Sequence, residues 1–212
     1  MNETIQTLLF PFERDLLPYP GAGERLLLFG ATGDFRRPPS FAAQMELVQD
    51  FRPDFLALER AGFSPVPRAR IEGADAALLL LGRSRAENET RFAEALRRVR
   101  PGGLVLAAGA KKDGARSIAN RVAQLLPLEN RLSKHHGIVF WLFRPGMLDE
   151  AVPAALTAPA SPTMENYETA VGGFSEGSVD PGSRLLADSL PQDISGHVAD
   201  FAAGWGYVSL RI

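Results

Sequence analysis

The sequence predicts an α/β protein with a three-layer, parallel or mixed sheet. Four short runs are almost wholly apolar, which is typical of strands buried on both faces of a sheet: Arg25–Phe29, Ala76–Leu81, Leu104–Ala108 and Gly137–Phe143. Segments with helical periodicity separate these runs, and glycines and prolines mark the joints between them. Strands that alternate with helices of this length favour parallel pairing between two helical layers.

The helices are predicted from capping residues and from apolar faces with helical spacing. A serine or a proline stands at the start of three of them, where it would satisfy or remove a free backbone N–H group. Four helices are expected in this part of the chain: a segment capped by Ser40 that carries Phe41, Met45, Leu47 and Val48, then Pro53–Ala61, Arg85–Val99 with Ser84 as its cap, and Gly114–Leu126.

The composition changes near residue 150. Residues 151–168 are rich in alanine and proline and show no apolar period, which is typical of a linker. Beyond them Asp180 or Ser183 can cap a helix that runs towards Leu190, and a strand at Val198–Phe201 leads into a glycine turn, which repeats the pattern of Arg25–Gly33. We therefore expect a first domain over 1–150, a linker over 151–168, and the start of a second, incomplete domain over 169–212.

Charge is distributed unevenly along the 212 residues. The totals are 23 basic and 25 acidic side chains, but Arg83–Arg144 contains 13 basic and 5 acidic ones. A basic middle between acidic ends fits a polyanion partner such as RNA. The alternative is a set of solvated helix faces, because acidic and basic residues intermingle over Arg85–Arg98.

Several function classes are disfavoured by what the sequence lacks. There is no cysteine, which excludes disulfides and thiolate metal sites and fits a cytoplasmic location. No apolar run approaches the roughly 18 residues of a membrane span, and no secretory signal is visible at the amino terminus. We therefore expect neither a membrane partner nor a metal.

Histidine and tryptophan add little to the functional interpretation. His135 and His136 are adjacent, so in a strand they would face opposite sides, and no spacing indicates a metal site. Trp141 lies in an apolar run and is expected in the core, whereas Trp205 lies within a glycine turn.

The strongest chemical motif is Asp200-Phe-Ala-Ala-Gly204-Trp-Gly206. An acid at a strand end, followed by two glycines, allows the backbone to approach a ligand closely, although a tight turn without a ligand has the same pattern. A second turn, Gly30-Ala-Thr-Gly33, would suit a nicotinamide-dependent oxidoreductase. That alternative is disfavoured by the Arg36-Arg37-Pro38-Pro39 run that follows and by the lack of a Tyr-x-x-x-Lys dyad.

Separate motifs resemble, in the same order, those of bacterial small-subunit rRNA guanine-N2 methyltransferases. In the second part these are Phe174-Ser175-x-Gly177-x-x-Asp180-x-Gly182-Ser183-x-Leu185-Leu186 and Val198-Ala-Asp200-x-x-x-Gly204-x-Gly206. In the first part they are Gly73-Ala-Asp-Ala-Ala-Leu-Leu-Leu-Leu81, Arg83-Ser-Arg-Ala-Glu87, Pro101-Gly-Gly103, Gly109-x-Lys111-x-x-Gly114 and Ser133-Lys134-x-His136-Gly137.

The resemblance implies two tandem Rossmann-like class I methyltransferase domains. The first is a degenerate copy that assists folding and RNA binding, and the second binds S-adenosylmethionine and catalyses methyl transfer to rRNA. The cofactor-binding positions that it implies are Asp180, Gly182, Ser183, Asp200, Ala202, Gly204 and Gly206, with Ala202 where the family usually has a glycine.

The resemblance also sets what this chain is expected to do. The family's Asn-Pro-Pro motif, which holds the target amine, does not occur in the sequence, and the chain ends six residues after Gly206. We therefore expect no catalytic residue here, weak or no cofactor binding, and an inactive chain. RNA contacts are expected at Lys111, Lys112 and Lys134, with rRNA or the small ribosomal subunit as partner. The alternative is a free-standing, non-catalytic α/β adaptor that binds RNA or protein.

Overall fold

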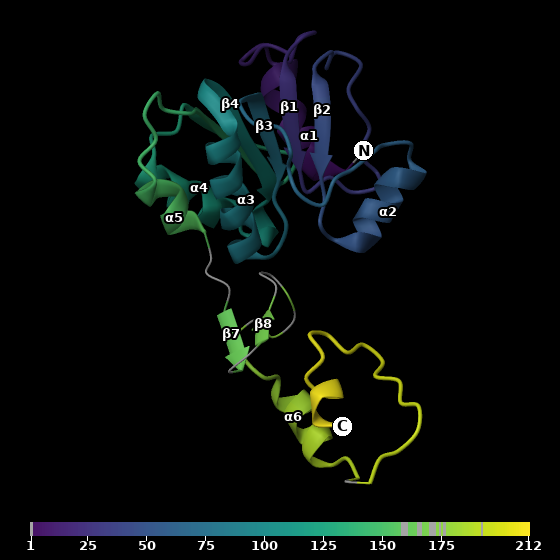
Figure 1. Cartoon of the computed structure of the whole chain (residues 1–212). Coiled ribbons are helices and arrows are strands. Elements are labelled where there is room, and N and C mark those ends of the chain that lie inside the picture. The colour runs from purple at the N-terminus through teal and green to yellow at the C-terminus, as the bar shows by residue number, and fades with distance from the viewer. Residues whose placement is uncertain are drawn as a thin grey trace. The chain divides into compact units, whose positions relative to one another are not determined.

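The computed structural model describes residues 2–157, 161–164, 167–169, 173, 175, 177–191 and 193–212. The chain divides into two compact units, Met1–Thr157 (unit 1) and Ala158–Ile212 (unit 2), which are described separately below. Figure 1 shows their elements along the chain.

Unit 1 is built on a mixed sheet of six strands in the order β2-β1-β3-β4-β6-β5. Figure 1 labels the first four strands of this order. The first four neighbours in this order run parallel, whereas β6 pairs antiparallel with both β4 and β5. The strands are β1 (Arg25–Phe29), β2 (Gln44–Val48), β3 (Ala74–Leu80), β4 (Val99–Ala110), β5 (Asn130–Lys134) and β6 (Gly137–Phe143). The predicted α/β architecture with a parallel or mixed sheet is confirmed.

Helices cover both faces of this sheet, so that the unit has three layers. They are α1 (Glu3–Glu13), α2 (Arg52–Arg60), α3 (Arg85–Arg98), α4 (Ala115–Leu125) and α5 (Ala151–Leu156), with the short 3-10 turn η1 at Lys111–Asp113. Residues of α1 and α2 join the apolar core on one face, and residues of α3, α4 and α5 join the core on the other.

Side chains of each strand alternate between these two cores. Leu26 and Leu28 of β1 pack with α1, whereas Leu27 and Phe29 pack with α3 and α4. Burial on both faces explains why the strands are continuous apolar runs rather than alternating ones. Trp141 is 2% exposed and lies in the core, as predicted.

The expected helix after Ser40 is wrong, because residues 44–48 form strand β2. Pro38 and Pro39 have no backbone N–H to donate, and the Arg37 guanidinium instead donates to the carbonyls of Phe41 and Ala43. This loop leads to the free edge of β1, and β2 pairs there in parallel with β1 from Gln44 to Val48. Helix α1 and strand β5 were not expected from the sequence.

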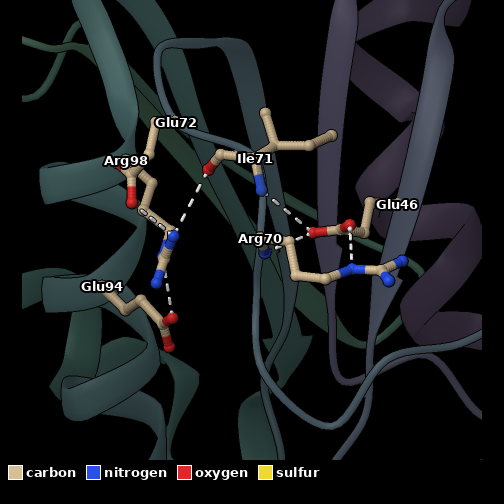
Figure 2. Close-up of polar contacts among 6 residues, drawn as sticks. All are labelled: Glu46, Arg70, Ile71, Glu72, Glu94 and Arg98. Atoms are coloured by element: carbon tan, nitrogen blue, oxygen red, sulfur yellow. Dashed lines mark hydrogen bonds and ion pairs between the residues drawn. The ribbon is translucent and has the colours of Figure 1, made fainter.

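Figure 2 shows how the segment between α2 and β3 is fastened to the sheet. Oε1 of Glu46 on β2 accepts hydrogen bonds from the backbone N–H groups of Arg70 (2.7 Å) and Ile71 (3.3 Å). On the other side Arg98 of α3 pairs with Glu72 at 2.7 Å. The Glu46 carboxylate therefore supplies the acceptor that a neighbouring strand would otherwise give to these two backbone N–H groups.

Unit 2 contains a two-stranded antiparallel sheet of β7 (Ser161–Met164) and β8 (Tyr167–Thr169), the helix α6 (Pro181–Asp188) and the 3-10 turn η2 (Ser209–Arg211). Asp180 caps α6, as predicted. The strand expected at Val198–Phe201 is wrong: residues 198–200 have no regular secondary structure, Phe201 lies in a turn, and none of them pairs with a strand in the described part of the chain. An isolated strand leaves its backbone groups without ladder partners, which explains why this one does not form here.

The expected linker over 151–168 is organised differently in the structure. Its first six residues form α5, and Leu156 is buried in the core beside α3. Residues 161–164 and 167–169 form the strands of unit 2. The positions 158–160 and 165–166, and also Phe174 of the motif, lie outside the described residues.

Candidate functional site

A small cavity in unit 2 brings together five of the seven predicted cofactor-binding residues: Asp180, Ser183, Asp200, Ala202 and Gly204. Its volume is about 170 Å³. The remaining lining residues are Leu186, Phe201, Ala203, Trp205, Tyr207 and Val208. Helix α6 and the glycine turn therefore form one concave surface, and two carboxylates that are 20 residues apart in the sequence, Asp180 and Asp200, lie in its wall.

Asp180 is held at the start of α6 by a capping hydrogen bond. The backbone N–H of Ser183 donates to its Oδ2 at 2.8 Å. A Cβ atom on Gly182 would lie 3.0 Å from the same oxygen, so a larger residue at that position would press on the carboxylate. Gly182 does not line the cavity, but its missing side chain allows Asp180 to cap the helix and still face the cavity.

Asp200 is held by a residue that the sequence interpretation did not single out. The hydroxyl of Ser209 on η2 donates to Oδ2 of Asp200 at 2.7 Å. The hydrogen bond joins the two ends of the turn, because Ser209 follows three residues after Gly206. No spacing rule used on the sequence would have found this partner.

The turn between these residues runs through the left-handed region of backbone space three times. The φ angles are +60° at Ala202, +61° at Gly204 and +91° at Gly206. The N–H of Gly206 donates to the carbonyl of Ala203 at 2.9 Å and so closes the turn. L-residues adopt this conformation at a cost and glycine does not, so the alanine at position 202 is strained where a glycine would not be.

Aromatic side chains form the far side of the turn. The rings of Trp205 and Tyr207 lie 5.5 Å apart between centroids, and the Arg211 guanidinium lies 5.4 Å from the Tyr207 ring centroid. Tyr207 is 4% exposed and anchors the turn. Trp205 therefore contributes to the cavity wall as well as to packing.

The cavity fits one end of S-adenosylmethionine better than the whole molecule. Pockets that enclose a drug-sized ligand generally have about 300 to 1,000 Å³, and this one is smaller. Its two carboxylates, from Asp180 and Asp200, suit the cationic methionine end or a hydroxyl donor. The residues that line the cavity therefore fit the methionine end of S-adenosylmethionine but do not enclose the whole cofactor.

The three lysines expected to contact RNA lie at one edge of the unit 1 sheet. Strand β4 ends one residue before Lys111, β5 ends at Lys134, and both strands pair with β6 at Gly137. The N–H of Lys111 donates to the carbonyl of His136 at 3.1 Å. Lys111, Lys112 and Lys134 are all exposed. The fold thus brings basic residues from two distant segments to the carboxyl ends of β4 and β5.

The acid nearest to these lysines in sequence is already paired. Asp113 lies 3.4 Å from Arg83, whose side chain is exposed. The acidic charge of Asp113 is thus offset by Arg83 at the same edge of the sheet. Of the five charged side chains named at this edge, four are basic, which supports a positive local potential there.

His135 and His136 lie outside the predicted strand Gly137–Phe143, and in the structure they belong to no strand. They form the two-residue turn between β5 and β6, with φ angles of +48° and +56°. Among the described residues no group of three or more potential ligands is placed to hold a metal ion. In the same part of the chain no helix has the length and apolar character needed to cross a membrane.

A second cavity, of about 200 Å³, lies at the opposite edge of the unit 1 sheet. Its wall includes Asp75, which accepts hydrogen bonds from the backbone N–H of Arg25 at 2.8 Å and from Nε of Arg100 at 2.7 Å. These donors, the Arg25 N–H first, hold the pKa of the Asp75 carboxyl below its ordinary value. The carboxylate ties β1 and β4 to the start of β3.

The comparisons with known proteins match both parts of the chain. Residues 166–212 match the family model "methyltransferase small domain". The chain is 27% identical over 143 residues to "Ribosomal RNA small subunit methyltransferase C" of Pseudoalteromonas atlantica, a match that covers 63% of this chain and 40% of the relative.

Solved structures share the fold. The 16S rRNA N2 methyltransferase of T. thermophilus, solved with AdoMet and guanosine, aligns with a TM-score of 0.56 and 24% identity over 85% of this chain and 51% of that one. The ribosomal protein L11 methylase of Lactobacillus delbrueckii aligns with a TM-score of 0.50 and 11% identity over 68% and 79% of the two chains. The chain thus spans about half, or less, of the rRNA methyltransferases it matches, and the Rossmann-like methyltransferase fold is confirmed.

Proposed function

We propose a function from the premise that this chain is related to the bacterial small-subunit rRNA guanine-N2 methyltransferases. Residues 1–150 would act as a degenerate methyltransferase-like domain that binds rRNA and assists folding. Residues 151–168 would connect it to residues 169–212, the first part of the S-adenosylmethionine-binding domain. The observation that carries the proposal is the cavity in the family-matched segment that gathers Asp180, Ser183 and Asp200.

The cavity supports a role in holding the cofactor. S-adenosylmethionine, when bound, supplies a methyl group on a sulfonium centre. Asp180 and Asp200 would hold its cationic end, and the left-handed turn at Gly204 would let backbone groups come close to it. Two serines hold these carboxylates in place. The backbone N–H of Ser183 donates to Asp180, and the hydroxyl of Ser209 donates to Asp200.

The basic edge of unit 1 supports a role in RNA binding. Lysine side chains bind phosphates without reading sequence, so these residues would position the domain on the RNA rather than select a nucleotide. Lys111, Lys112 and Lys134 are the residues that we assign to this role, with rRNA or the small ribosomal subunit as partner.

The 212-residue chain by itself is proposed to bind the cofactor weakly and to transfer no methyl group. The cavity is smaller than the cofactor needs, and the sequence contains no Asn-Pro-Pro motif to position the target amine. The cytoplasm is the expected location.

The test is to titrate the 212-residue chain with S-adenosylmethionine and to measure binding by calorimetry and by changes in NMR chemical shifts. We expect a dissociation constant weaker than roughly 100 µM, a range in which few contacts are made. Asp200→Asn should remove the binding, and Asp188→Asn, on α6 but outside this cavity, should not. Micromolar or tighter binding contradicts the weak-binding proposal, and unchanged binding by Asp200→Asn contradicts the assignment of the cavity. Intact rRNA binding without any cofactor binding would favour an adaptor.

A further inference from the structure

The turn between β5 and β6 carries two imidazole rings where a hairpin usually has small residues. His135 and His136 both have positive φ angles, +48° and +56°, which is the backbone of a type I′ turn. Asn-Gly is the preferred sequence for this turn, because glycine and asparagine adopt the left-handed region readily. Histidine is also enriched in that region, so this turn can hold both residues, and it places two flat rings at its tip.

The turn is held in place from two sides. The hydroxyl of Thr7 on α1 donates to the carbonyl of Glu3 in its own helix at 2.7 Å and also lies 3.1 Å from the carbonyl oxygen of Lys134. On the other side the N–H of Lys111 donates to the carbonyl of His136 at 3.1 Å. The backbone of the turn therefore lies between α1 and η1, next to the strand ends that carry the lysines.

An aromatic ring from α1 completes the cluster. The Phe10 ring lies 6.2 Å from the His135 ring between centroids, with the two planes at 82°. The Lys134 ammonium lies 5.8 Å from the Phe10 centroid. Phe10 and His135 are partly exposed, and His136 and Lys134 are exposed. Phe10 therefore lies between the His135 ring and the Lys134 ammonium on the surface of unit 1, and His136 follows His135 in the exposed turn.

We propose that Phe10, His135 and His136 form a stacking site for an unpaired nucleobase of single-stranded RNA, beside the lysines that hold its phosphates. Flat rings beside cations are the combination that single-stranded nucleic acids bind, because every base has a face to stack and every phosphate a charge to neutralise. A surface that contacted only duplex phosphates would need the lysines but not the rings. The inference rests on the proposed RNA-binding function of unit 1 and adds to it the kind of RNA that is bound.

The test uses the 212-residue chain and two labelled 12-nucleotide probes, oligoadenylate and an abasic RNA backbone of equal length. Asparagine keeps the left-handed turn but removes the ring, so the variant is His135→Asn/His136→Asn. It should bind oligoadenylate roughly 5- to 30-fold more weakly, the loss typical of one stacked base. Its affinity for the abasic probe, and the dependence of log affinity on log salt, should be unchanged.

The matched control is Lys112→Ala, which should weaken binding of both probes alike and lower the salt slope by about 1. If the histidine variant does not fold, as judged by circular dichroism, Phe10→Leu takes its place with the same expected pattern. Equal affinity of the folded ring variant and the wild type for oligoadenylate would overturn the stacking site. If Lys112→Ala still weakened both probes, the proposed RNA-binding function would survive that result. Failure of the wild type to bind either probe would contradict the RNA-binding function itself.

Discussion

The hydroxyl of Ser209 donates a 2.7 Å hydrogen bond to Oδ2 of Asp200, which lies in the wall of the unit 2 cavity. The bond connects the start and the end of a turn whose residues 202, 204 and 206 are left-handed. It fixes one carboxylate oxygen towards the turn and leaves the other for a ligand. Ser209 is thus a positioning residue that acts through Asp200.

Ser209→Ala should weaken the binding of S-adenosylmethionine by roughly fivefold, because a hydrogen bond to a carboxylate contributes about 1 kcal/mol or more. NMR titration measures the loss. Ser189→Ala is the control, since the Ser189 hydroxyl donates to the carbonyl of Leu185 and does not touch the cavity. Equal losses in the two variants would show that Ser209 has only a structural role.

Ala202→Gly should stabilise the turn. The alanine has a φ angle of +60°, and a left-handed L-residue costs about 1 kcal/mol or slightly more relative to glycine. We expect slower amide hydrogen exchange over residues 200–209 and tighter cofactor binding. Ala203→Gly, at a neighbouring position without a positive φ, should have the opposite effect on exchange, because it only adds freedom to the unfolded chain. Faster exchange in Ala202→Gly would contradict the strain argument.

Asp75→Asn should change how the stability of unit 1 depends on pH. The pKa of Asp75 is lowered in the folded state, so its contribution to the free energy of unfolding is present above the unfolded pKa, about 3.9, and is lost as the pH falls through the folded value. The variant should be less stable than the wild type at pH 7, and the difference should shrink below about pH 4. Urea unfolding at several pH values measures this, and a difference that stays constant with pH would contradict it.

Glu46→Ala should destabilise unit 1 by about 1 to 3 kcal/mol, because two backbone donors in the α2–β3 segment lose their acceptor. The matched control is Glu72→Ala in the same cluster (Figure 2). The Glu72 side chain is 74% exposed and pairs with Arg98, so its loss should cost at most about 1 kcal/mol. Urea unfolding measures the free energy of unfolding of both variants. An equal decrease in the two would contradict the larger contribution that we assign to Glu46.

The sequence was most informative where burial alone determines structure. The runs at Arg25–Phe29 and Gly137–Phe143 become β1 and β6 because apolar residues on both faces suit only a strand covered by two layers. Ser84 and Asp180 cap α3 and α6 as expected, since a capping side chain acts on residues two or three positions away.

Elements that depend on distant partners were harder to predict. Residues 44–48 form β2 because β1 offers an open edge, which no local pattern reveals. Val198–Phe201 forms no strand because no partner strand pairs with it in the described part of the chain. Likewise the Ser209–Asp200 bond and the Phe10–His135 contact depend on how a turn closes or how two distant segments meet.

The central claim is that unit 1 binds rRNA through the lysines at the carboxyl ends of β4 and β5, and its most direct test is a salt-dependent binding measurement. The wild type and Lys111→Ala/Lys112→Ala/Lys134→Ala are titrated with a small-subunit rRNA transcript at several salt concentrations. We predict weaker binding by the variant and a salt slope reduced by about 2 to 3, because about three phosphate contacts are lost. Unchanged affinity together with an unchanged slope would contradict the claim.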